Sequence, residues 1–367
     1  MPSDLSILLC ISSLITGGAE RQVQLVAGGL VAQGVDLHIA YLAGSPVPSC
    51  LQRPGITLHP LPARSNHDPG LAWALVRLVR GLAPDCVLTM LPQMDVLGGI
   101  AAKVCGRPHI LFERSSGDCY PVGLKTWLRQ AVGKRAAGVL ANSEGGSAYW
   151  APSRPHDPPR LVPNCMDITG IEQSPIPDVR DHGLPEDAKI VLSVGRLSPE
   201  KNPAVVVRAM PLVLARHPGA HLVLFGNGPQ EGLIRGMVES AGLGANIHLM
   251  GFSGAVWGWM RRADVLVAPS HFEGAPNVVL EAIAARAPLA VSDIPAHREI
   301  LDESSACFFT PTAASEVAAA IDGVLSDPNS ARKRATNAEA KLLGRGIDEV
   351  AREWISQIRI VAGIGVS

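Results

Sequence analysis

Two glutamates, Glu273 and Glu281, stand eight residues apart within the segment 269–293, PSHFEGAPNVVLEAIAARAPLAVSD. The first follows an apolar strand pattern and is expected on a loop, whereas the second lies one turn into an apolar helix that begins near Asn277. The unpaired N–H groups and the positive dipole of this helix start suit a diphosphate, and Glu281 could accept hydrogen bonds from ribose hydroxyls. The other residues expected to meet such a ligand here are Gly274, Ala275, Pro276 and Val278.

Two basic side chains, Arg196 and Lys201, follow another strand pattern in the segment VLSVGRLSPEKNP. Two fixed cations in a dry site can stabilise the negative charge that grows on a phosphate leaving group as its bond breaks. The chain has no Asp-x-Asp pair to hold a divalent ion for the same purpose. We therefore expect no metal site, no metal requirement and no other cofactor.

Glycines between the first strand pattern and the first helix pattern form a further candidate. Gly17 and Gly18 precede a helix expected over 19–33, and they allow the backbone to approach a phosphate or a sugar closely. The signal is weak alone, because Gly-Gly turns are common and the dinucleotide-binding pattern Gly-x-Gly-x-x-Gly is missing.

Short apolar runs alternate with helical patterns along the chain, which predicts βαβ units and parallel sheets. This alternation of strand and helix patterns extends from LSILLCIS to PHILFE and begins again at AKIVLSVG. The sequence therefore predicts two doubly wound α/β domains. Repeated prolines between 151 and 185 forbid a long helix or a central strand there. The length of 367 residues also suits two domains with separate cores.

Together these segments resemble the glycosyltransferases of family 4. The run from Glu273 to Glu281 is similar to the E-x7-E signature of that family, GRLSPEKN is similar to its G-R-L-x-x-x-K-N element, and GGAER matches an element bordering the donor and acceptor clefts. The resemblance spans nearly the whole chain and implies the GT-B fold, with two Rossmann-like doubly wound domains facing across a cleft. It implies an acceptor-side domain over residues 1–170, a linker over 171–185 and a nucleotide-sugar-binding domain over 186–346. A helix within 347–367 would cross back to the first domain.

The resemblance also implies roles for residues. Arg196 and Lys201 would hold the donor diphosphate, Glu273 would position hydroxyls of the donor sugar, and Glu281 would bind ribose. Family members retain the anomeric configuration without an agreed enzymic nucleophile, so we expect front-side attack, with the leaving phosphate accepting the incoming proton. The turns FGNGP and GF resemble the surroundings of the nucleobase, which adds donor-side contacts at Gly226, Gly228 and Phe252.

The acceptor side is less specific. RPHILFERSSGD ends a strand pattern at Glu113 and Arg114, at the edge where open α/β sheets bind ligands, and ERSS resembles a variant in bacterial transferases that add hexosamines to lipid-linked oligosaccharides. We assign both residues to the acceptor side, with a structural salt bridge as the alternative. Residues 123–138 combine cations such as Arg129 with apolar groups such as Trp127, as would a helix on an anionic membrane. The alternative is a helix whose charges merely face water.

Composition excludes nucleic-acid binding. The 32 basic and 33 acidic side chains give a formal net charge of −1, and only 4% of residues are aromatic, so neither an attractive field nor a stacking surface is present. Seven cysteines, an odd number without a Cys-x-x-Cys pair, favour a reducing compartment. No apolar run reaches about eighteen residues. We expect a cytoplasmic protein that can lie on the cytoplasmic face of an inner membrane.

These observations predict a retaining glycosyltransferase acting in cell-envelope polysaccharide synthesis. Its donor would be a UDP-linked hexose or N-acetylhexosamine, and its acceptor a hydroxyl of a glycan or of a lipid-linked glycan. Two alternatives remain open: a nucleotide-sugar 2-epimerase of GT-B fold, against which EGAPN and GRLSPEKN argue, and a catalytically idle scaffold that binds nucleotide sugar. A dehydrogenase ranks last because the dinucleotide-binding pattern is missing.

Overall fold

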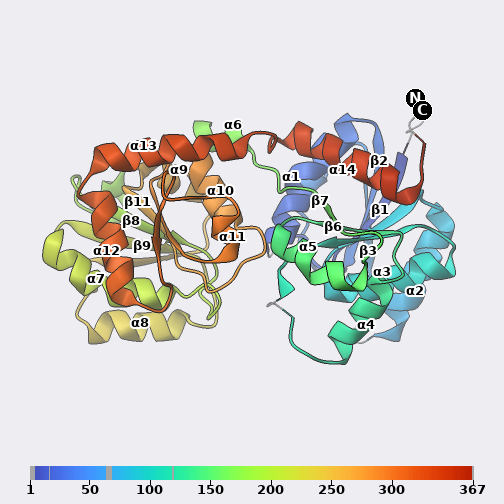
Figure 1. Cartoon of the computed structure of the whole chain (residues 1–367), viewed down its shortest axis with the longest axis horizontal. Coiled ribbons are helices and arrows are strands. Elements are labelled where there is room, and N and C mark those ends of the chain that lie inside the picture. The colour runs from blue at the N-terminus through green and yellow to red at the C-terminus, as the bar shows by residue number, and fades with distance from the viewer. Residues whose placement is uncertain (1–4, 16, 63–67, 118–119, 366–367) are drawn as a thin grey trace. The chain divides into compact units, whose positions relative to one another are not determined.

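The computed structural model describes residues 5–15, 17–62, 68–117 and 120–365, which divide into two compact units (Figure 1). The first unit comprises residues 1–165 and 344–367, and the second comprises residues 166–343. Each unit contains one parallel sheet and its own hydrophobic core. No helix in the described part of the chain is both long enough and apolar enough to cross a membrane.

The first unit is built on seven parallel strands in the spatial order β3-β2-β1-β4-β5-β6-β7. The order reverses between β1 and β4, and ligands of such sheets bind beyond the carboxyl ends of the strands near this point. The strands are β1 (Leu5–Cys10), β2 (Val35–Leu42), β3 (Ile56–Leu61), β4 (Cys86–Thr89), β5 (His109–Glu113), β6 (Gly138–Ala141) and β7 (Arg160–Leu161).

Helices cover both faces of this sheet, because alternate residues of a strand point to opposite sides. In β1, Ile7 and Leu9 pack in one core cluster with α1 and α14, whereas Leu8 and Cys10 pack in another with α2 and α3. The helices of the unit are α1 (Gly18–Ala32), α2 (Pro69–Leu82), α3 (Pro92–Val104), α4 (Leu124–Gly133), α5 (Glu144–Trp150) and α14 (Ile347–Ala362).

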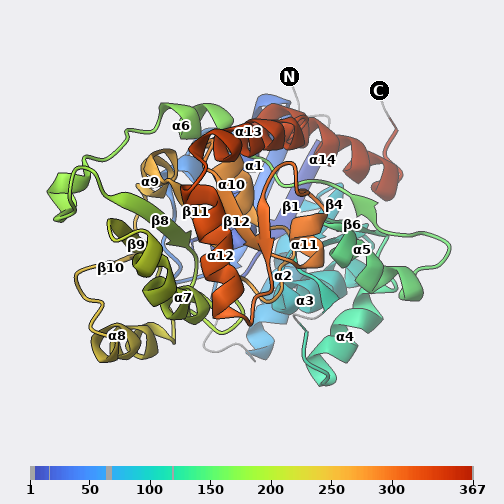
Figure 2. The same ribbon diagram turned by 60° about the vertical axis from the view of Figure 1, so that its left-hand side comes forward.

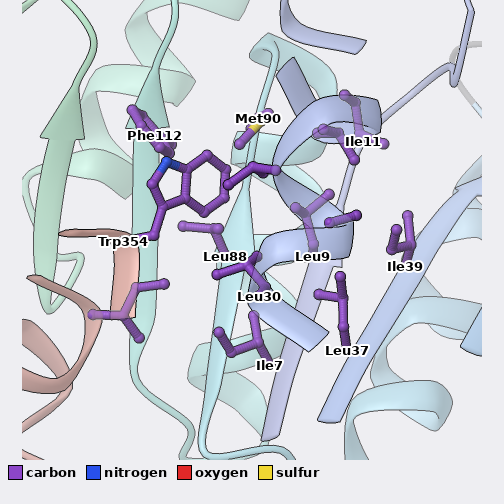
Figure 3. Packing of buried hydrophobic residues seen from close by; sticks show 14 of the residues in the cluster. Ile7, Leu9, Ile11, Leu30, Leu37, Ile39, Leu88, Met90, Phe112 and Trp354 are labelled. Atoms are coloured by element: carbon purple, nitrogen blue, oxygen red, sulfur yellow. The ribbon is translucent and has the colours of Figure 1, made fainter. Parts of the chain in front are cut away.

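The last helix, α14, completes the core of the first unit although it follows the whole second unit in sequence. Figure 3 shows its Trp354 beside Phe112 of β5, and the two ring centroids are 4.8 Å apart. Gly29 lets α1 and α14 approach closely, because a Cβ atom there would lie 3.0 Å from the Ala351 Cβ. Burial of the large indole against the sheet therefore fixes the C-terminal helix.

The second unit repeats the architecture with six parallel strands in the order β10-β9-β8-β11-β12-β13, which Figure 2 shows from another side. Residues 171–185, expected as a linker, belong to this unit, where Ile171, Val179 and Leu184 are buried. The strands are β8 (Lys189–Val194), β9 (Ala220–Phe225), β10 (Ile247–Gly251), β11 (Val265–Ala268), β12 (Leu289–Ser292) and β13 (Cys307–Phe309). The helices are α6 (Ile168–Gln173), α7 (Pro203–Arg216), α8 (Glu231–Ser240), α9 (Val256–Arg262), α10 (Asn277–Ala284), α11 (Pro295–Arg298), α12 (Ala314–Leu325) and α13 (Pro328–Glu339).

The packing of α14 gives a stability prediction. Trp354→Ala should lower the free energy of unfolding of the first unit by about 3–5 kcal/mol, because it removes a buried aromatic side chain and leaves a cavity. The control Ile360→Ala, on the same helix at a residue that is 54% exposed, should cost about 0.5 kcal/mol or less. Urea unfolding followed by circular dichroism measures both, and equal losses in the two variants would refute the anchoring role of Trp354.

Candidate active site

The predicted donor-side residues of the second unit gather on loops at the carboxyl edge of its sheet. Because all strands of this sheet run parallel, the loops that follow them emerge at one edge. The loops after β8, β9, β10 and β11 carry, in that order, Arg196 and Lys201, Gly226 and Gly228, Phe252, and Glu273. Residues separated by up to 77 positions in the sequence, from Arg196 to Glu273, thus share one edge.

Glu273 and Lys201 form the central contact of this edge. The Lys201 ammonium forms an ion pair with Oε1 of Glu273, and the same oxygen accepts a hydrogen bond of 2.7 Å from the Ser270 hydroxyl. The Glu273 side chain is 14% exposed and that of Lys201 is 32% exposed. A cation and a carboxylate thus meet at one partly dry point, where electrostatic interactions are stronger than in bulk water.

Three residues that the sequence analysis did not select hold the loops around this pair. Asn202, in the left-handed conformation with φ of 53°, donates hydrogen bonds to the Pro311 carbonyl at 2.7 Å and to the Pro269 carbonyl at 3.3 Å. The Ser292 hydroxyl donates to the Ser270 carbonyl at 2.6 Å. These contacts tie the loops after β8, β11, β12 and β13 together and so fix the backbone that carries Glu273.

The third residue, His297 of α11, is fully buried below these loops. Its Nδ1 lies 2.8 Å from the Ser292 carbonyl oxygen, which can only accept, so Nδ1 carries the hydrogen. Burial lowers the pKa of His297 below its usual value, although the Ser292 hydrogen bond opposes this shift. The imidazole is therefore neutral at pH 7 and supports the loop without adding charge.

The glycines of the FGNGP turn are required by close packing between two loops. A Cβ atom on Gly226, whose φ is 130°, would lie 1.9 Å from the Gly195 carbonyl oxygen. A Cβ atom on Gly228 would lie 2.3 Å from the Leu197 carbonyl oxygen. Only glycine at both positions lets the loop after β9 support the loop that carries Arg196.

Arg196 and Phe252 present exposed side chains at this edge. Arg196 is exposed, and its charge acts on Glu200 of the same loop. Burial raises the pKa of the Glu200 carboxyl, but the Ser198 hydrogen bond and the charges of Arg196 and Lys201 outweigh this effect and lower it below its usual value. Phe252 follows β10 and is 80% exposed, which leaves an aromatic face available for stacking.

The helix α10 begins at Asn277, as the sequence predicts, with Pro276 as its N-terminal capping residue. The side chain of Pro276 makes no hydrogen bond to this helix start. Glu281 lies in the second turn and is half-buried. The loop Gly274–Ala275–Pro276 therefore joins the Glu273 carboxylate to a helix start that suits an anion, with Val278 in the first turn.

In the first unit, Gly17 and Gly18 stand at the start of α1, where Gly17 is the capping residue. A Cβ atom on Gly17 would lie 2.6 Å from Oε2 of Glu20, so the glutamate side chain folds back over the helix start. Gln22 and Cys165 exchange two hydrogen bonds, of 3.0 and 2.8 Å, which fasten α1 to the end of the unit.

Glu113 is fully buried in a network of hydrogen bonds at the end of β5. Its Oε1 accepts from the Tyr120 hydroxyl at 2.5 Å and from the Arg114 and Ser115 amides at 2.9 Å. Its Oε2 accepts from Trp150 Nε1 at 2.8 Å and forms an ion pair with the Arg129 guanidinium at 2.8 Å. Both oxygens are engaged inside the protein, which supports the structural salt bridge for Glu113 and leaves Arg114 as the acceptor-side candidate.

The structure corrects the expectation that Arg129 faces a membrane from the segment 123–138. The Arg129 side chain is 1% exposed, and its Nε donates to Asp95 at 2.7 Å in addition to the ion pair with Glu113. It points inward because two buried carboxylates require a counter-charge. Burial raises the pKa of Asp95 to about 6, although the charge of Arg129 opposes this shift.

No group of three or more histidine, cysteine, aspartate or glutamate side chains that could hold a metal ion occurs in the part of the chain that the structure describes.

Comparisons with known proteins agree with this arrangement. Residues 16–169 match Glycosyltransferase Family 4, and residues 177–341 match Glycosyl transferases group 1. An uncharacterised glycosyltransferase of Methanocaldococcus jannaschii is 31% identical over 185 residues, which are 49% of this chain and 47% of that protein. The chain spans less than half the length of this relative and of two others, of which it covers 34% and 42%.

Two further proteins resemble this chain over more of its length. The N-acetylgalactosamine-N,N'-diacetylbacillosaminyl-diphospho-undecaprenol 4-alpha-N-acetylgalactosaminyltransferase of Campylobacter jejuni is 22% identical over 307 residues, which are 77% of this chain and 79% of that protein. The crystal structure of Anabaena HepE in complex with UDP-glucose superposes on this chain with a TM-score of 0.86 at 19% identity. The aligned region covers 97% of this chain and 100% of the HepE chain.

Both units therefore have the Rossmann-like architecture of the GT-B fold, as the sequence predicts. The chain belongs to the glycosyltransferases of family 4, an enzyme family, which confirms the resemblance drawn from its motifs.

The contact between Ser270 and Glu273 gives a prediction about the site. Ser270→Ala should lower kcat/KM by about tenfold, because it removes one of the two groups that hold Oε1 of Glu273. The control Ser326→Ala removes a hydroxyl that also bonds to a carboxylate, at 3.0 Å, but at the exposed end of α12. Initial rates of sugar transfer measure both, and a Ser270 variant as active as the control would exclude this role.

Proposed function

We propose that the protein transfers a sugar from a nucleoside diphosphate to a hydroxyl group of a glycan or lipid-linked acceptor, with retention of the anomeric configuration. The observation that carries the proposal is the contact between Lys201 and Glu273 beside the start of α10. This contact supports the proposal because a cation at this point could stabilise a leaving diphosphate, and a carboxylate beside it could hold sugar hydroxyls.

The reaction requires the bond between the anomeric carbon and the diphosphate to break while the acceptor oxygen forms a new bond to that carbon. Arg196, Lys201 and the N–H groups at the start of α10 stabilise the charge that grows on the diphosphate. Glu273 holds hydroxyls of the sugar, and Glu281 binds the ribose. The departing phosphate oxygen takes the proton of the acceptor hydroxyl, so this mechanism requires no side chain as nucleophile.

The donor proposed here is a UDP-linked hexose or N-acetylhexosamine. Anabaena HepE has been crystallised with UDP-glucose, and the name of the Campylobacter relative specifies an N-acetylgalactosaminyl group. The exposed ring of Phe252 offers a surface on which a base can stack at the same edge as Arg196. Gly226 and Gly228 bring backbone groups to this place.

The acceptor proposed here is a glycan carried on a lipid diphosphate, as in the name of the Campylobacter relative. We place the reaction in cell-envelope polysaccharide synthesis at the cytoplasmic surface of a membrane, where a soluble donor and a lipid-bound acceptor can meet. Six cysteines of the described chain are free thiols, which is compatible with a reducing compartment.

Three neighbouring helices of the first unit support contact with an anionic membrane. Helix α3 packs against both α2 and α4. The only carboxylate within the three helices is Asp95, which is buried. Their exposed apolar residues are Trp73, Ile100, Val104, Leu124, Trp127 and Leu128, and their exposed cations are Arg77, Arg80, Lys103 and Lys125. Such a surface combines apolar burial with attraction to anionic headgroups.

The two cations lead to a prediction for activity. Arg196→Ala and Lys201→Ala should each lower kcat by about one hundredfold, because each removes a group that stabilises the developing diphosphate charge. Arg208→Ala, at an exposed position of α7, is the control and should leave transfer unchanged. Analysis of the sugar products with and without acceptor measures the effect and detects an epimerase. Near-normal transfer by both test variants would contradict the assigned roles.

We also propose that transfer requires no divalent cation, because Arg196 and Lys201 provide positive charge for the diphosphate. Incubation with EDTA, followed by assay in metal-free buffer, should leave the rate within about twofold of the untreated value. A loss of transfer that added Mg²⁺ or Mn²⁺ restores would show that a metal takes part.

Flotation with lipid vesicles tests the membrane surface. The full chain should float with vesicles that contain phosphatidylglycerol at moderate salt, and the double variant Leu124→Ser, Trp127→Ser should float less, because it removes apolar area from α4. Leu212→Ser, at a residue of the second unit that is 50% exposed, controls for surface hydrophobicity. Wild-type protein that stays with the soluble fraction would remove the membrane proposal and leave the transferase proposal intact.

A further inference from the structure

Two arginines of the first unit differ sharply in how their charge is satisfied. Arg129 forms ion pairs with both Asp95 and Glu113. Arg114, directly after β5, forms no ion pair with any carboxylate in the described part of the chain. Its guanidinium has five N–H groups, and one of its nitrogens, Nη2, donates to Asn164 Oδ1 at 2.8 Å. Its Nε and Nη1 atoms are buried without a hydrogen-bond partner.

Glu113, the acidic residue next to Arg114, does not balance the charge of Arg114. Both oxygens of Glu113 are occupied by Arg129, Trp150, Tyr120 and backbone amides, and Arg129 provides the counter-charge. Burial, the largest effect, lowers the pKa of the Arg114 guanidinium to about 10, while nearby groups that include Glu113 and Glu20 oppose this shift. Arg114 therefore remains a cation at neutral pH. A buried cation without an anionic partner is unfavourable unless a ligand provides one.

The position of Arg114 matches that of a ligand-binding residue. It follows β5, one strand away from the point where the strand order reverses, at the carboxyl edge of the sheet. The charge of Glu20, in the first turn of α1, raises the pKa of the Arg114 guanidinium and so opposes the effect of burial. The residue as a whole is half-buried, although its Nε and Nη1 atoms are buried.

A second buried polar atom near Arg114, the Oδ1 atom of Asn142, also lacks a hydrogen-bond partner. Asn142, after β6, donates from Nδ2 to Asn164 Oδ1 at 3.3 Å, the same oxygen that Arg114 uses. The Oδ1 atom of Asn142 is buried without a hydrogen-bond donor. The loops after β5, β6 and β7 thus bring together unused donors on Arg114 and an unused acceptor on Asn142. A ligand that carries an anion and a hydroxyl would satisfy both.

We propose that Arg114 binds a phosphoryl group of a substrate, through the N–H groups on Nε and Nη1 that have no partner within the protein. A guanidinium stays charged at neutral pH, and its N–H groups form strong hydrogen bonds to phosphate oxygens. The inference deepens the proposed function and rests on it, because that reaction has two substrates with phosphoryl groups, the nucleoside diphosphate and a lipid-diphosphate acceptor. Arg114 would be a binding residue for one of these, whereas Arg196 and Lys201 bind the leaving diphosphate.

Calorimetric titration with UDP and with inorganic pyrophosphate tests this site in the full chain. Wild-type protein is first saturated with UDP and then titrated with pyrophosphate. If Arg114 serves the acceptor, pyrophosphate should still bind to the UDP-saturated protein, and Arg114→Gln should weaken this binding by about tenfold or more while leaving the affinity for UDP unchanged. If Arg114 serves the donor, Arg114→Gln should instead weaken UDP binding by a similar factor.

Two variants control for folding and for general charge. Arg114→Lys keeps the positive charge without the N–H groups of the guanidinium, so it should bind more weakly than wild type and more tightly than Arg114→Gln. Arg135→Gln removes an exposed cation of the same unit and should change neither affinity. Circular dichroism establishes that each variant is folded. If Arg114→Gln does not fold, the comparison of Arg114→Lys with wild type decides.

The outcomes separate this site from the proposed function. Unchanged affinities for both ligands in the Arg114 variants would overturn the inference, even if the wild type transfers sugar. A wild-type protein that binds no UDP would contradict the proposed function. Pyrophosphate binding that depends on Arg114 would still support a phosphoryl site in that case.

Discussion

The ion pair between Lys201 and Glu273 is the interaction on which the account of the second unit depends. A lysine and a glutamate that lie 72 residues apart can meet only if the loops after β8 and β11 leave the sheet at the same edge. Parallel strands provide that edge, glycines allow the loops to pack closely, and Asn202 and Ser292 fasten them. In the proposed function, the cation of this pair stabilises a diphosphate and its carboxylate holds a sugar.

In the first unit, the main electrostatic feature is the balance of buried charges around Arg129. Arg129 balances Asp95 and Glu113 inside the protein, and so attaches α4 to the end of β5 while the apolar residues of α4 stay exposed. Arg114, one residue beyond Glu113, has no such balance. The hydrogen bonds around Glu113 are complete within the protein, so this part of the edge is structural. Arg114 keeps unused N–H groups, and it is the part of the edge proposed to bind substrate.

The sequence predicts much of this organisation because its signals are local. Apolar runs, helix periodicity and strand-end glycines indicate two Rossmann-like units, and Asn277 begins α10 as predicted. Contacts that close over long separations were missed: Ser292 bonds to the Ser270 backbone, and Asn202 bonds to Pro311, 109 residues away. Arg129 was predicted to face outward because helix periodicity does not reveal buried carboxylates on other elements.

A crystal structure of the protein with an intact UDP-sugar tests the central claim most directly. The account predicts diphosphate oxygens within about 3.2 Å of Lys201 Nζ and of the Arg196 guanidinium, with a sugar hydroxyl donating to Glu273. A diphosphate bound at another place, with Lys201 and Glu273 still paired to each other and in contact with no part of the donor, would contradict it.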